Sequence, residues 1–180
     1  RFNYLTLGRE EDSLSYVLNG DTVALIIDNS PASSALLRGL TNPQIDKLQH
    51  IAISSSISSQ QQSRIVNLGR KNPKIGLTFF DPGSSLDSVT SVWVKHRIIP
   101  ILNHFSPRSL VVSNKLFTKG NRPIFKKLKD LEYLYLLIDG EFDIESIPQL
   151  SGLKTLNLIG DEDGRFFLNG SLKYLTKATP

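Results

Sequence analysis

The sequence predicts an α/β fold of about seven irregular repeats, each a short β-strand followed by a helix or a loop. Two observations predict it. Short runs with alternating apolar residues return along the whole chain, and most segments between them carry helix caps or helical apolar spacing. A length of 180 residues and an apolar fraction of 39% suffice for one sizeable hydrophobic core. We therefore expect residues 1–180 to form a single domain.

The predicted strands are runs in which apolar residues alternate over a few positions. Taking the middle apolar residue of each run as a marker gives successive spacings of 20, 26, 26, 33, 24 and 22 residues, which predicts repeats of uneven length. The runs lie at 2–7, 23–27, 48–53, 75–80, 109–113, 131–138 and 153–159, with a weaker one at 172–175. Their seven markers are Leu5, Leu25, Ile51, Leu77, Leu110, Leu134 and Leu156.

Helices are predicted in the first connections between the strands. Ser30 before Pro31 is a typical helix start, and Gly39 is a typical stop. Residues 57–68 have helical apolar spacing. Their Ser/Gln-rich beginning at 54–63 is equally typical of a loop, so both interpretations stay open there.

The later connections predict one further helix and two looser segments. Ser84 and Asp87 resemble a capping box before a helical stretch, and we expect Pro100 to kink or end that helix. Residues 115–128 and 141–150 predict loose connections with about one helical turn each.

The most regular feature of the runs is the motif L-x-x-L-x-L. It stands at 131–136 and 153–158, with isoleucine substitutions at 48–53 and a phenylalanine start at 2–7. In these motifs the chain resembles the leucine-rich-repeat superfamily, over essentially its whole length. Variable repeat lengths and helical connections are similar to the intracellular, F-box-protein-like branch. The family usually has Asn or Cys after the motif, whereas this chain has Ser56, Asp139 and Asp161.

The resemblance implies a solenoid with a parallel sheet on its concave side and helices or loops on its convex side. Solenoids need polar caps at their ends, and neither end of this sequence carries one. The first residue is also not methionine. We therefore expect the domain to be a slice of a longer solenoid, incomplete at both ends.

The resemblance also implies a non-catalytic protein-protein interaction module that recognises its partner on the concave strands. Membership of the F-box-like branch would make it a substrate receptor or scaffold in a ubiquitin-ligase-type complex. Side chains that alternate with the motif leucines would face the partner. These predicted contacts are Tyr4, Thr6, His50, Thr78, Ser109, Tyr133, Tyr135, Thr155 and Asn157.

The composition excludes several kinds of chemistry. Without cysteine there is no disulfide, thiolate metal site or cysteine nucleophile. Phosphate-loop, dinucleotide, zinc-protease and serine-elbow motifs are absent, so we predict no enzyme, metal site or cofactor. No run of 18 apolar residues and no signal-peptide layout occurs, which predicts no membrane association and an intracellular location, cytoplasmic or nuclear.

Charge is unevenly distributed and leaves a nucleic-acid interface as one alternative. Residues 108–129 hold seven basic and no acidic side chains, whereas 130–163 hold nine acidic side chains and one lysine. The simpler interpretation is two solvated surfaces that partly neutralise each other. The basic residues are Arg108, Lys115, Lys119, Arg122, Lys126, Lys127 and Lys129.

A doubly wound α/β enzyme is the other alternative, because strand–helix alternation at about 25 residues also fits βαβ units. Its site would lie at the carboxyl ends of the strands, near Asp28, Asp81 and Asp139. The polar residues that interrupt one strand face argue against it, since doubly wound strands are apolar on both faces.

Overall fold

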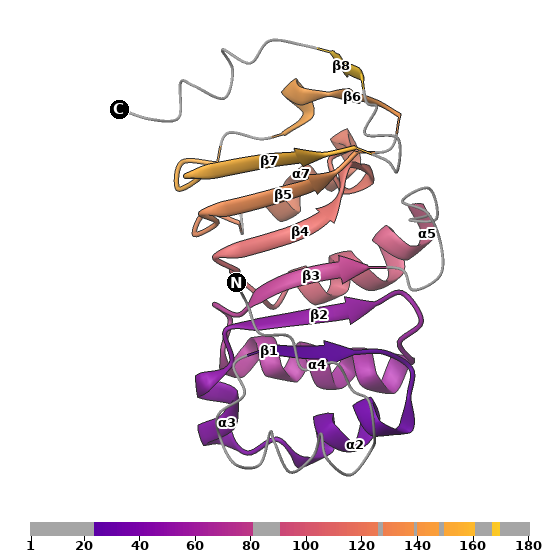
Figure 1. Cartoon of the computed structure of the whole chain (residues 1–180), viewed down its shortest axis with the longest axis vertical. Coiled ribbons are helices and arrows are strands. Elements are labelled where there is room, and N and C mark those ends of the chain that lie inside the picture. Colours follow the sequence, from indigo (N-terminus) through magenta and orange to yellow (C-terminus); the bar gives the residue numbers. More distant parts are fainter. Residues whose placement is uncertain are drawn as a thin grey trace.

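The computed structural model describes residues 24–80, 91–125, 128–138, 140–147, 150–160 and 167–169. A six-stranded parallel sheet runs through these residues in the order β1-β2-β3-β4-β5-β7 (Figure 1). The α/β class is therefore confirmed. The strands are β1 (Ala24–Ile27), β2 (His50–Ser54), β3 (Gly76–Phe80), β4 (Ser109–Ser113), β5 (Tyr133–Leu137) and β7 (Thr155–Ile159), and a separate parallel pair is formed by β6 (Glu141–Asp143) and β8 (Phe167–Asn169).

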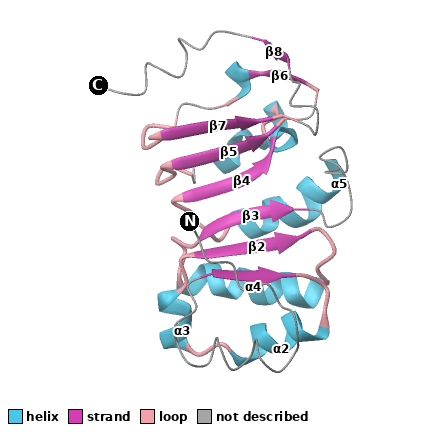
Figure 2. Ribbon diagram, in the orientation of Figure 1, coloured by secondary structure: helices cyan, strands magenta, loops and turns pink. Residues whose placement is uncertain are grey.

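The helices cover one face of the sheet. Figure 2 shows α4 behind the strands, and apolar side chains from the helices join one core cluster with the strands. The helices are α2 (Pro31–Gly39), α3 (Asn42–Lys47), α4 (Ser59–Lys71), α5 (Ser91–Trp93), the π-helical η2 (Val94–Ile98), α6 (Ile99–Leu102) and α7 (Arg122–Phe125). The described residues also form the 3₁₀ turns η3 (Asn114–Leu116), η4 (Lys119–Asn121) and η5 (Ile144–Ser146).

The predicted markers lie in one row across the sheet. Leu25, Ile51 and Leu77 are direct partners on β1, β2 and β3, and the row continues through the markers of β4, β5 and β7. Each strand of this sheet therefore lies beside the strand of the same sheet that precedes it in the sequence, and the described part of the sheet advances in one direction. The first marker, Leu5, and the weak run at 172–175 lie outside the described residues.

The motif leucines face the helices, as predicted from alternation. Leu131, Leu134 and Leu136 are fully buried, while the leucines of the next motif are partly buried against the same core. In the described motifs, which begin at 48, 131 and 153, the first residue closes a turn before its strand. Its N–H donates to the carbonyl three residues earlier, at 3.2, 3.1 and 3.0 Å. These three units thus share the same turn.

Helix caps fix where the first helices begin. The Ser30 hydroxyl accepts the N–H of Ser33 at the start of α2, which confirms that predicted start. Helix α4 begins at Ser59 rather than at residue 57, because Ser58 and Gln61 form a reciprocal capping box. The first part of the Ser/Gln-rich segment is therefore a loop and the rest is helix.

Helix α3 was not predicted from apolar periodicity. It is only six residues long, and its beginning is marked by Thr41 and Gln44, where the Gln44 side chain accepts the Thr41 N–H at 2.8 Å. The T-x-x-Q sequence was the available signal, because it is a capping-box pattern.

Pro100 does not end its helix. The chain continues from the π-helical η2 into α6, and residues beyond the proline, such as Ile101 and Leu102, pack in the core as expected. A proline has no N–H to donate to the carbonyl four residues earlier, which here belongs to His96. The Gln62 side-chain amide donates to that carbonyl at 3.1 Å and so ties this helix to α4.

The two segments expected to be loose differ from each other. Residues 115–128 contain short turns and α7, in agreement with the prediction. Residues 141–150 begin with β6, which pairs with β8 and was not predicted, and the expected helical turn follows as η5. In the parts of the chain that the structure describes, no helix is long and apolar enough to cross a bilayer.

Candidate functional site

The predicted contact residues share the sheet face that points away from the motif leucines. We call it the second face; none of the helices labelled in Figure 1 covers it. Ser109, Tyr133 and Thr155 form one row, and Thr78, Tyr135 and Asn157 belong to the row two residues further along the strands. The structure therefore brings these predicted residues together. Tyr4 and Thr6 lie outside the described residues.

The exposed part of the second face lies on β5 and β7. The side chains of Tyr133 and Ile159 are 38% and 43% exposed, and Asn157 is exposed as well. Among the described residues only one other large apolar side chain, Val92 on α5, is exposed to a comparable degree. We define the β5–β7 strip as Tyr133, Tyr135, Leu137, Thr155, Asn157 and Ile159.

His50 lies on the second face but is buried, unlike the other predicted contacts that the structure describes. Its side chain is 2% exposed, with Nε2 2.8 Å from the Thr78 hydroxyl and Nδ1 3.4 Å from the Ser109 hydroxyl. The ring fits because Gly76 has no side chain, since a Cβ there would lie 2.6 Å from Nδ1. Burial lowers the pKa of His50 from 6.5 to about 4.

The contact between His50 and Ser109 does not make a serine-nucleophile site. The imidazole is shielded from solvent, and 3.4 Å is the outer limit for a hydrogen bond. This group of side chains, which we call the His50 cluster, instead joins β2 to β3 and β4 through Thr78 and Ser109.

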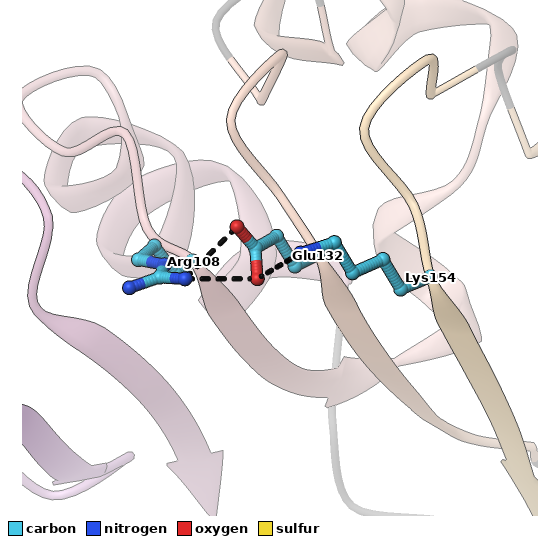
Figure 3. A network of polar contacts seen from close by, with 3 residues as sticks. All are labelled: Arg108, Glu132 and Lys154. Atoms are coloured by element: carbon cyan, nitrogen blue, oxygen red, sulfur yellow. Dashed lines mark hydrogen bonds and ion pairs between the residues drawn. The ribbon is translucent and has the colours of Figure 1, made fainter.

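A charged network borders the β5–β7 strip where the strands begin (Figure 3). Arg108 Nη2 lies 3.0 Å from each carboxylate oxygen of Glu132, and Lys154 Nζ lies 3.1 Å from Oε2. Hydrogen bonds from Arg108 and then Lys154 hold the pKa of Glu132 below its usual range. Each residue directly precedes a strand, so the three occupy equivalent positions in successive units.

The network links the basic and acidic segments of the sequence. Arg108 belongs to the basic segment and Glu132 to the acidic one, so at this position the two charges neutralise each other. Elsewhere in the basic segment, Lys129 is exposed and Lys115 is half-buried. The side chains of Lys119, Arg122, Lys126 and Lys127 lie outside the described part of the structure.

One of the residues proposed for an enzyme site, Asp28 at the end of β1, has a structural role. Asp28 Oδ1 accepts the Ser30 N–H at 3.0 Å and the Ser33 hydroxyl at 2.6 Å. Burial raises the pKa of Asp28, but these hydrogen bonds lower it by more, so the pKa lies below its usual value. The carboxylate therefore holds the start of α2. Asp81 and Asp139 lie outside the described residues.

Two further observations bear on that enzyme alternative. Doubly wound sheets bind ligands where the strand order reverses, and the six described strands of the main sheet contain no reversal. Within the described residues, no group of three or more metal-ligating side chains is close enough to hold an ion.

Comparison of the chain with protein-family models, curated proteins and solved structures finds no match. The site therefore has to be interpreted from its own geometry. Sequence reasoning missed the charged network, although opposite charges stand at the same motif position in 131–136 and 153–158. It also missed Leu137 and Ile159, which directly follow those motifs and extend the strip.

Proposed function

We propose that this chain is a leucine-rich-repeat type of solenoid that binds a protein partner on the second face of its sheet. Support for the repeat architecture comes from the single row of markers, the one-directional strand order and the recurring turn before the strands. Helices lie on one face of the sheet, and on the other face the strands β5 and β7 carry exposed side chains, as a protein-binding surface requires.

The β5–β7 strip carries the proposal. It combines Tyr133 and Tyr135 with the apolar Ile159 and the polar Asn157 on two rigid neighbouring strands. Tyrosine offers a large apolar ring with a hydrogen-bonding tip and loses little conformational entropy on binding, so it is enriched at interface hot spots. A polar, charged border is provided by Arg108, Glu132 and Lys154, so a partner would meet an apolar centre with a polar rim.

The test is site-specific photo-crosslinking in cells that express the intact protein. A photoreactive amino acid is placed at position 133 and, as a matched control, at Val92, which is exposed on the helical side. A partner that crosslinks from 133 and not from 92 is expected. The double substitution Tyr133→Ala/Ile159→Ala should lower the affinity of that partner by about tenfold or more, as for a hot-spot pair, and Val92→Ala should not.

Equal crosslinking from both positions, or binding that survives loss of both strip residues, would contradict the proposal. The identity of the captured protein also decides the finer role. Ubiquitin-ligase subunits or their substrates are expected if the resemblance to the F-box-like branch holds. A nucleic acid crosslinked through the basic segment would favour that alternative instead.

A further inference from the structure

A small hollow opens on the helical side of the molecule, between α2, α3 and α4. Its volume is about 210 Å³, and its floor consists of Leu37, Leu40, Ile45 and Leu68. Leu37, Ile45 and Leu68 are at most 6% exposed and belong to the main core cluster. The floor is therefore a firm apolar surface rather than a gap between mobile side chains.

Cationic side chains form the rim of this hollow. Arg64 and Lys71 lie seven residues apart on α4, with Asn67 and Leu68 between them on the same helix face. Arg38 approaches from α2. Arg38 and Lys71 are exposed, and Arg64 is half-buried.

Among the described residues, no acidic side chain is seen paired with the rim cations. Lys71 Nζ donates to the neutral Asn42 side chain at 2.8 Å, and none of the ion pairs seen among the described residues includes a rim cation. Residues 29–74, which contain all three helices, hold six basic side chains and one acidic one. That acid, Asp46, does not line the hollow.

The size and the lining restrict what can bind. Sites for whole small molecules usually measure about 300–1,000 Å³, so this hollow accommodates a single apolar side chain. None of its lining residues is aromatic, so the hollow lacks the stacking platforms typical of single-stranded nucleic-acid sites. We propose that the hollow binds an acidic peptide, with one large apolar side chain on the leucine floor and flanking carboxylates on Arg38, Arg64 and Lys71. This surface is separate from the β5–β7 strip.

The test uses fluorescein-labelled peptides of about 12 residues, rich in Glu and Asp, with one central Leu, Ile or Phe. Fluorescence anisotropy measures their affinity for the full chain. We expect at least one of them to bind about tenfold more tightly than the same peptide with Gly at the centre. The double substitution Arg38→Glu/Lys71→Glu should weaken that binding about tenfold. The matched control Lys74→Glu/Lys95→Glu reverses two exposed cations outside the hollow and should change the affinity less than about twofold.

Circular dichroism checks that each variant is folded. The proposal is overturned if the central apolar residue has no effect on affinity for any peptide. Equal losses in the rim and control variants would also overturn it, because they would show only general attraction between opposite charges. A single-stranded oligonucleotide that binds more tightly than every peptide, and loses its affinity in the rim variant, would identify the hollow as a nucleic-acid site instead.

Discussion

Replacing His50 by Gln should remove most of the pH dependence of stability between neutral and mildly acidic solution. In the folded protein the pKa of His50 is lowered to about 4 by burial, whereas in the unfolded chain it is about 6.5. As the pH falls below the unfolded value, the unfolded chain takes up a proton that the folded protein does not. The free energy of unfolding therefore falls with the pH in this range.

The size of the effect follows from the two pKa values. Proton linkage over this shift predicts that the wild-type protein loses about 2 kcal/mol of unfolding free energy between about pH 7.5 and about pH 5. The carboxylates Asp28 and Glu132 have pKa values below their usual ranges, so their contributions are lost only at more acidic pH. A loss of stability between these two pH values is therefore assigned to His50 rather than to these two carboxylates.

Urea unfolding at constant ionic strength, carried out at both pH values, measures the slope of the unfolding free energy against pH. His50→Gln can itself change the stability through Thr78 and Ser109, so the difference between the two pH values is compared rather than either absolute value. The control is His96→Gln, at an exposed position, which should keep the wild-type slope. If His50→Gln keeps that slope as well, the burial of His50 does not control the acid sensitivity and the reasoning fails.

Two further predictions concern the packing of α4 and the charged network. Gly69→Ala should destabilise the fold by about 1–3 kcal/mol in urea unfolding, because the new Cβ would lie 2.6 Å from Phe105 Cδ2. The control, Gly120→Ala, meets nothing within 4 Å, and equal losses in both variants would contradict the packing argument. Glu132→Gln should lower stability slightly at neutral pH and low salt, because it removes the ion pair with Arg108. The loss should disappear at about 0.5 M NaCl and at a pH below the lowered pKa of Glu132, and a salt-independent loss would refute the electrostatic origin.

The strands and their register could be predicted from the sequence because they depend on one requirement. Leu25, Ile51 and Leu77 have to reach the same core as the later markers, and only in-register parallel pairing places them in one row. The start of α2 was also predictable, since Ser30 and Pro31 act on neighbouring residues only.

The burial of His50 could not be predicted in the same way. Alternation shows which strand residues share a face, but it does not show whether that face is covered. His50 also depends on Gly76, a residue 26 positions away whose lack of a side chain makes room for the ring. The helix around Pro100 also involves a residue distant in sequence, because the Gln62 side chain on α4 donates to the His96 carbonyl.

The unequal spacings between the markers indicate on which side of the sheet additional residues are accommodated. The longest step, 33 residues, separates Leu77 from Leu110, yet these markers still pair directly. The extra chain contains α5, η2 and α6, which pack on the helical side through α4. The additional residues of the longest step thus lie on the helical side, where the hollow also lies, while the sheet keeps its register. A sheet built this way can vary one surface without disturbing the other, so the two proposed sites are expected to bind independently.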